Sequence, residues 1–225
     1  MKKIKTALIS VSDKKNLEKI GQYLSKLGIK ILSTGGSAKA LQNSGIEVTE
    51  VSEHTGFPEI LDGRVKTLNP IIHGGILARR NDTNHIKTIT QHNIELIDLV
   101  IINLYPFVKT ISKPDTTLNE AIENIDIGGP AMIRSSAKNY EDVAIVTDPN
   151  DYDQLKQELE NNNGSVTVEF KKNLAIKAFE HTSKYDEAIF QYLNGDRSSS
   201  NGDFPEKLIF SLQKSMDMRY GENPH

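Results

Sequence analysis

Short β-branched segments alternate with helical patterns along residues 4–148, and this alternation restricts the possible folds more than any other feature of the chain. Residues 4–12 predict a buried strand, and apolar residues at helical spacing then predict a helix over 14–27 that ends at a glycine. Strands predicted at 29–34 and 46–52 flank a second, shorter helix. This β-α-β-α-β order is typical of a parallel sheet covered by helices.

The rest of the pattern brings the total to about five strands. Residues 99–104 predict a central strand buried on both faces and ended by Pro106, and the last strand is expected at 143–148. A polar stretch rich in serine, glycine and asparagine predicts a linker at 195–207. Further helices are expected at 83–93, 116–125, 129–139, 150–162 and 168–193.

Composition restricts the partners rather than the fold. The formal net charge is −3, with Lys and Arg spread along the chain, so we expect neither nucleic acid nor a membrane surface as a partner. The chain has no cysteine, which excludes disulfides and thiolate metal sites. No apolar run approaches the roughly 20 residues of a membrane span, and the N-terminus lacks a signal peptide's apolar core. We therefore expect a cytoplasmic protein.

The sequence STGGS begins at Ser33, where a predicted strand ends and a helix begins. Ligands of open parallel sheets bind at the carboxyl ends of the strands, where Thr34, Gly35 and Gly36 would lie. A glycine pair lets backbone N–H groups approach an anion, and the start of a helix favours negative charge, which together predict a phosphate cradle. The alternative is an ordinary turn that needs glycine for its φ angle and serine as a helix cap.

Two further clusters contain charged residues. Arg64 and Lys66 lie two apart, so in an extended segment both would project to the same side and could reach one ligand. Asp126 precedes a double glycine, and Lys138 would lie about two to three turns along the following helix. Alternatively, Asp126 caps that helix and the three cationic side chains are simply solvated. The six histidines show no metal-ligand spacing, so we expect no metal site and a structural role for His73.

Seven blocks of the sequence occur in the order found in a known enzyme family: SVSDK, STGGSA, GRVKTL, HGGIL, NLYPF, DIGGPAMIRSSAKN and RYGENPH. In these blocks the chain resembles the bifunctional purine-biosynthesis enzymes that join inosine monophosphate (IMP) cyclohydrolase to aminoimidazole-carboxamide-ribotide (AICAR) transformylase. The resemblance implies a three-layer, methylglyoxal-synthase-like α/β domain at 1–148 with a mainly parallel five-stranded sheet. A helical extension at 149–194, the linker at 195–207 and the start of the transformylase domain at 208–225 would follow.

The same resemblance implies a reaction. The cyclohydrolase closes the purine ring of formamido-imidazole-carboxamide ribotide (FAICAR) to give IMP with loss of water, and it needs no cofactor. The 10-formyltetrahydrofolate of the family belongs to the transformylase domain, most of which this sequence lacks, so we expect no folate-dependent formyl transfer. The resemblance also implies a homodimer, whose contacts we expect in the helices after Asp148 and in residues 208–220.

The family's functional positions can be transferred to this sequence one by one. The catalytic positions correspond to Lys66 and Tyr105, which would act on the oxyanion and the departing water, and to Asp126 and Lys138, which would transfer protons at the amide. The nucleotide-binding positions correspond to Ser10, Ser12, Asp13, Lys14, Ser33, Thr34, Gly35, Gly36, Arg64, Thr67, Asn103, Ile127 and Gly128. Arg219 and Tyr220 resemble the first AICAR contacts of the transformylase.

One departure and two rival functions accompany this resemblance. Asn69 stands where family members often have histidine, and because an amide does not titrate near neutrality, we leave it out of the catalytic set. A methylglyoxal-synthase-like phosphate lyase shares the fold, although the NLYPF and RYGENPH blocks argue against that activity. A regulatory module that binds a nucleotide without turnover is the other alternative.

Overall fold

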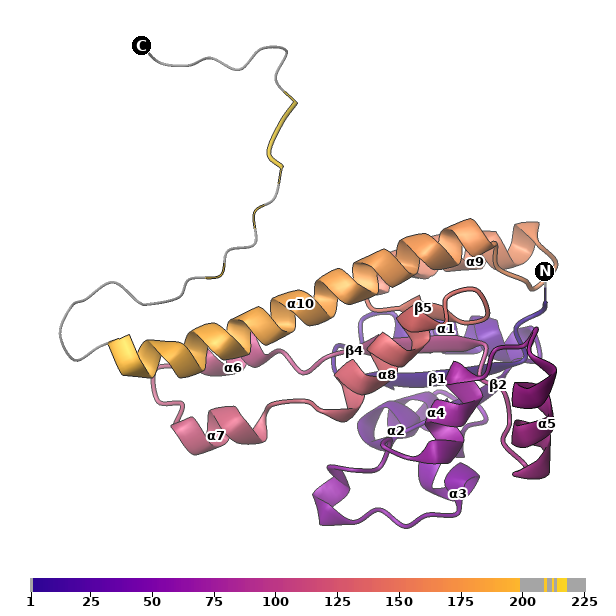
Figure 1. Cartoon of the computed structure of the whole chain (residues 1–225), viewed down its shortest axis with the longest axis horizontal. Helices are drawn as coiled ribbons and strands as arrows, with labels where there is room; N and C mark the ends of the chain where they lie inside the picture. Colours follow the sequence, from indigo (N-terminus) through magenta and orange to yellow (C-terminus); the bar gives the residue numbers. More distant parts are fainter. Residues whose placement is uncertain (1, 199–208, 210–211, 213, 218–225) are drawn as a thin grey trace.

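A five-stranded, wholly parallel sheet forms the centre of the protein in the computed structural model, which describes residues 2–198, 209, 212 and 214–217. The strand order is β3-β2-β1-β4-β5 (Figure 1). The strands are β1 (Thr6–Val11), β2 (Lys30–Ser33), β3 (Thr49–Glu50), β4 (Leu99–Asn103) and β5 (Ala144–Val146). β1 pairs with β4 in the register Ile9↔Ile101 and Val11↔Asn103. The predicted α/β class and mainly parallel sheet are confirmed.

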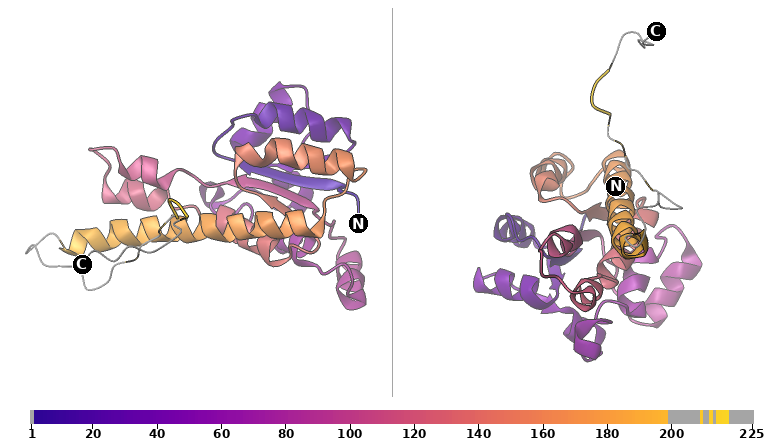
Figure 2. Two further views of the ribbon diagram at one scale, coloured as in Figure 1. Left: turned by 90° about the horizontal axis from the view of Figure 1, so that it is seen from above. Right: turned by 90° about the vertical axis from the view of Figure 1, so that its left-hand side faces the viewer.

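Helices cover both faces of the sheet, which gives the three layers visible in Figure 2. Because neighbouring side chains of a strand point to opposite faces, Ile9 and Ile101 pack on one face and Leu8 and Val100 on the other. The helices are α1 (Leu17–Lys26), α2 (Gly35–Asn43), α3 (Val51–Thr55), α4 (Pro70–Leu77), α5 (Thr83–Gln91), α6 (Phe107–Ile111), α7 (Leu118–Glu123), α8 (Gly128–Lys138), α9 (Tyr152–Asn161) and α10 (Val168–Ser198).

The long helix α10 packs against β5 and α8, and its C-terminal half passes beyond the sheet beside α6 (Figures 1 and 2). Apolar residues of α10, such as Ala178, are buried with the side chains of α8. The helix continues to Ser198 and so includes the first residues of the stretch predicted as a linker. The remaining linker residues, 199–207, and Arg219 and Tyr220 lie outside the described residues. Within the described parts, no helix has both the length and the apolar character needed to cross a membrane.

Candidate functional site

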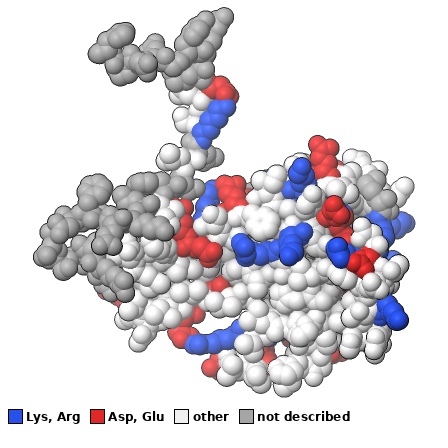
Figure 3. Space-filling view, viewed as in Figure 1, with Lys and Arg blue, Asp and Glu red and all other residues white. Residues whose placement is uncertain are grey.

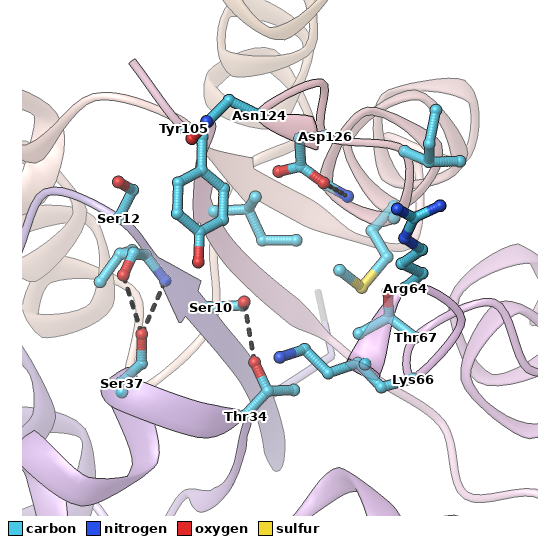
Figure 4. Close-up of a pocket in the computed structure, with 18 of the residues that line it drawn as sticks. Ser10, Ser12, Thr34, Ser37, Arg64, Lys66, Thr67, Tyr105, Asn124 and Asp126 are labelled. Carbon is cyan, nitrogen blue, oxygen red and sulfur yellow. Dashed lines mark hydrogen bonds between the residues drawn. The ribbon is translucent and has the colours of Figure 1, made fainter. Parts of the chain in front are cut away.

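A cavity of about 560 Å³ opens at the carboxyl ends of β1, β2 and β4, the edge at which the sequence predicted a ligand site. Its walls come from the strand ends, the start of α2, the loop before α4, the segment after β4 and the start of α8. Figure 4 shows Tyr105, Lys66 and Asp126 around one hollow. Predicted residues that line the cavity are Ser10, Ser12, Lys14, Thr34, Gly36, Arg64, Lys66, Thr67, Asn103, Tyr105, Asp126, Ile127 and Gly128.

Two ammonium groups flank the glycine pair at the start of α2. A Cβ built on Gly35 would lie 3.4 Å from Lys66 Nζ, and one built on Gly36 would lie 3.5 Å from Lys14 Nζ. The Thr34 side chain does not cap α2. It accepts no hydrogen bond from the backbone N–H groups of the first turn of that helix. The helix start and the two lysines together form a positive environment suited to a phosphate group.

Hydroxyl groups tie the strand ends together beneath this turn. Ser10 Oγ and Thr34 Oγ1 lie 3.0 Å apart and share a hydrogen bond (Figure 4). Ser37, which the sequence analysis missed, donates to Val11 O and accepts from Val11 N–H, both at 2.9 Å. Ser33 is fully buried and donates to Ile9 O at 2.7 Å, so its side chain does not line the cavity and is not placed for the predicted contact.

Asn103, the last residue of β4, shapes the turn after β1. Its Oδ1 accepts hydrogen bonds from the backbone N–H groups of Ser12, at 2.7 Å, and Asp13, at 2.9 Å. Its Nδ2 donates to Asp13 O at 3.0 Å. The Asp13 carboxylate instead accepts from Lys15 N–H, and Asp13 is not among the residues that line the cavity. The structure therefore supports a local structural role for Asp13 rather than the predicted contact.

The loop between α3 and α4 brings Arg64, Lys66 and Thr67 to the cavity. Arg64 pairs with Glu123 at the end of α7, and both side chains are more than half exposed. Lys66 Nζ lies 3.7 Å from Glu59 Oε1, and Thr67 is buried. A Cβ on Gly128 would overlap Thr67 Oγ1, which explains why glycine is required where the loop meets α8.

Asp126 is a half-buried carboxylate at the start of α8. Its Oδ1 accepts a hydrogen bond from Gly129 N–H at 2.9 Å, so the helix-capping role considered from the sequence is present. Burial raises the pKa of Asp126, while the Gly129 N–H and the charge of Lys66 act in the opposite direction. A base with a raised pKa is better matched to proton transfer near neutrality than an ordinary aspartate.

Lys138 does not join this group within one chain. Helix α8 does run from Gly128 to Lys138 as the sequence indicated, but its rise of about 1.5 Å per residue places the two ends roughly 15 Å apart. Lys138 is exposed and does not line the cavity. Within a single chain, Lys138 therefore lies too far from Asp126 to act with it at one amide, and Lys66 is the cation whose field acts on Asp126.

Two other residues singled out in the sequence have structural roles. Asn69 caps α4 by accepting from Ile71 N–H at 2.8 Å, which agrees with its exclusion from the catalytic set. His73 Nδ1 lies 3.1 Å from Ser135 Oγ, linking α4 to α8, and burial lowers the pKa of His73. In the described residues, no three His, Asp or Glu side chains are grouped as metal ligands.

The cavity also contains residues that sequence reasoning missed. Ser37 and Met132 lie within the quoted blocks but were not singled out, and the others carry no motif because their place depends on contacts between distant segments. Such residues are Ser37, Asp62, Ile102, Glu123, Asn124 and Met132. On the face drawn in Figure 3, Lys and Arg side chains are interspersed with Asp and Glu, so this face carries no extended patch of one sign.

Comparisons with known proteins identify the family of the chain. A family described as "MGS-like domain" matches residues 16–131, more than half of the chain, and a family described as "AICARFT/IMPCHase bienzyme" matches residues 136–225. A solved structure described as "Crystal structure of ForH" is 36% identical, with a TM-score of 0.75 over 84% of this chain and 99% of that chain. The chain therefore belongs to the MGS-like domain family, in the form that occurs with the AICARFT/IMPCHase bienzyme family.

Proposed function

We propose that this chain is an IMP cyclohydrolase that closes the ring of FAICAR to give IMP. The observation that carries the proposal is one cavity that combines an anion cradle beside Lys14 with Lys66, Tyr105 and Asp126. A volume of about 560 Å³ suits a nucleotide, whereas a triose phosphate would leave most of the space empty. The family matches support an enzyme of purine metabolism, and a cytoplasmic location is part of the proposal.

The proposed reaction needs positioning and proton transfer. The carboxamide nitrogen bonds to the formyl carbon, and the formyl oxygen leaves as water with one proton from each of the two nitrogens. Lys66 and Tyr105 stabilise the oxyanion and protonate the departing oxygen, and Asp126 removes a proton from the attacking amide. Both reacting groups belong to one ring system, so a rigid cavity wall contributes by holding the reactive rotamer. The chemistry requires no metal or redox cofactor.

Ultraviolet absorbance tests this proposal, because ring closure changes the chromophore. Purified chain mixed with FAICAR should produce IMP with turnover, identified by chromatography of the product. Phosphate release from dihydroxyacetone phosphate, without ring closure, would instead identify a phosphate lyase. Nucleotide binding without any turnover would identify a regulatory module and refute the enzyme assignment.

A homodimer is a second part of the proposal. The family resemblance supports it, and α9 and α10 are the described helices that follow Asp148. Exposed apolar side chains on α10, Ile176 and Phe179, offer contact area for a second copy. Light scattering at micromolar concentration should give twice the mass of the chain, and a stable monomer would remove this part of the proposal.

A further inference from the structure

The hydroxyl group of Tyr185, on α10, lies between two peptide groups of the cavity wall. It accepts a hydrogen bond from Asp126 N–H at 2.8 Å and donates one to Asn124 O at 3.4 Å. Tyr185 is 8% exposed, so these contacts are shielded from water. Both peptide groups belong to the short connection between α7 and α8, from which the Asp126 side chain projects.

The ring of Tyr185 contacts a second part of the same wall. It packs edge-on against the Phe107 ring, with centroids 6.1 Å apart and an interplanar angle of 69°. Phe107 is buried at the start of α6, and its N–H donates to Tyr105 O at 2.7 Å. One side chain therefore supports the two segments that carry Tyr105 and Asp126.

We propose that Tyr185 is a positioning residue for the candidate site, whose hydroxyl fixes the peptide of Asp126 and thereby aims its carboxylate. This inference rests on the proposed function for its catalytic meaning, but its geometric part does not. Tyr185 itself does not line the cavity, so it acts through Asp126 rather than on the substrate.

The hydrogen bonding of the connection explains why one hydroxyl matters. Asn124 N–H and Ile125 N–H are bonded to carbonyls of α7, and the Asp126 carboxylate is bonded to Gly129 N–H. Among the described residues, Tyr185 is the partner of Asp126 N–H. Burial raises the pKa of Tyr185, so the phenol stays neutral and can donate and accept together. Without it, the Asp126 peptide can rotate, and small displacements of a catalytic group are costly.

Tyr185→Phe removes the hydroxyl and keeps the ring, which makes it the informative variant. Tyr192→Phe is a matched control, because the Tyr192 ring also packs edge-on against Phe107, at 5.8 Å, from the same helix. Within the described residues, the Tyr192 hydroxyl makes no hydrogen bond. The experiment measures kcat and KM for FAICAR, the melting temperature, and hydrogen exchange of the Asp126 amide by NMR.

We expect Tyr185→Phe to lower kcat by about tenfold with little change in KM. The Asp126 amide should exchange faster, whereas Tyr192→Phe should behave as wild type in both measurements. Unchanged kcat in Tyr185→Phe, or an equal loss in Tyr192→Phe, overturns the inference. If the wild-type chain shows no turnover, the proposed function fails. Hydrogen exchange of the Asp126 amide in Tyr185→Phe then tests the geometric part by itself: faster exchange supports it, and unchanged exchange overturns it.

Discussion

Gly35 and Gly36 place different demands on the chain, although they are neighbours. Gly35 has φ +47°, in the left-handed region, whereas Gly36 has ordinary backbone and room for a Cβ at van der Waals distance from Lys14. A side chain at Gly35 strains the backbone, and one at Gly36 mainly fills the space above the helix start. The two positions can therefore separate stability from ligand binding.

Gly35→Ala should lower the free energy of unfolding by about 1–2 kcal/mol, because a left-handed backbone disfavours a Cβ. Gly36→Val should leave most of the stability but weaken IMP binding at least tenfold, because a branched side chain blocks close approach of the phosphate. Chemical denaturation and titration calorimetry measure the two effects. Normal IMP affinity in a folded Gly36→Val variant would place the phosphate elsewhere.

Lys66 and Lys138 form a matched pair for testing the cavity. Lys66→Ala should lower kcat by roughly 10²-fold, with a smaller change in IMP affinity, because its charge acts on the developing oxyanion. Lys138→Ala should keep kcat near that of wild type, because Lys138 lies exposed at the far end of α8. Steady-state kinetics at saturating FAICAR measures kcat for both variants and so tests this difference. A comparable loss in Lys138→Ala would require a second copy of the chain to bring that lysine to the site.

Asp126→Asn should separate activity from stability. Loss of the proton acceptor should lower kcat by roughly 10²-fold. Because burial raises the pKa of Asp126 above its ordinary value of 3.8, the folded state binds the proton more tightly, and the ionised form is a cost at neutral pH. The variant should therefore melt at the same or a higher temperature at pH 7, and this advantage should fade as the pH falls toward 3.8. A variant that melts well below wild type at pH 7 would contradict this sign.

The strand-end argument located the turn at Thr34 and Gly36, and the family resemblance supplied the other predicted residues that line the cavity. Sequence reasoning failed at Ser33, whose hydroxyl turns inward to Ile9 O, since the direction of a side chain at a strand end depends on the register. It failed at Tyr185 because that contact joins positions 59 residues apart. Lys138 was assigned from the family resemblance, and its separation of two to three helical turns from Asp126 places it away from this cavity within one chain.

The loop between α3 and α4 is the element that completes the cavity. Leu61, Asp62 and Gly63 all have positive φ, with values of 53°, 52° and 82°. Three successive left-handed residues are costly for the two that are not glycine. Beyond this bend, Arg64 reaches across to Glu123 of α7, so the ion pair joins two walls of the cavity.

Removing that ion pair should change binding more than stability. Exposed pairs contribute only about 0–1 kcal/mol, so Glu123→Gln should leave the free energy of unfolding within that range. Arg64 would then be available to the substrate without first losing a carboxylate partner, and KM for FAICAR should fall severalfold. Glu120→Gln, on the same helix but outside the cavity lining, is the control. A higher KM in Glu123→Gln would mean that the pair shapes the site.

Two predicted elements agree with the structure to within one residue at each end. β4 is buried on both faces as its apolar run indicated, and α8 spans the residues expected of it. The strand predicted at 46–52 is only Thr49–Glu50, and α3 begins at Val51. As an edge strand, β3 has one neighbour, so few hydrogen bonds oppose this early change to helix. Whether these residues continue the strand or begin a helix depends on the whole sheet, so no local sequence pattern predicts it.

For the molecule as a whole, three half-buried histidines predict sensitivity to acid. Burial lowers the pKa values of His54, His73 and His181, although Glu95 and Asp148 partly oppose this for the first and third. Below the ordinary value of 6.5 the unfolded chain takes up protons that the folded chain resists, so stability should fall as the pH drops from 6.5. The midpoints of urea unfolding at pH 7.5, 6.5 and 5.5 would measure this loss of stability. In the variant with all three histidines changed to glutamine, the midpoint should depend less on pH. An identical slope in that variant would assign the effect to other groups.

The central position of β1 has a consequence for synthesis of the protein. β1 is the first strand made, yet its partner β4 ends at Asn103, so the middle of the sheet stays incomplete while that intervening chain is translated. At about 5–20 residues per second this delay lasts roughly 5–20 s. During that time the apolar β1, already paired at most with β2, exposes an unpaired edge to other nascent chains. Contacts between residues this distant in sequence also slow refolding. Because of this strand order, we expect chaperones to bind the newly made chain.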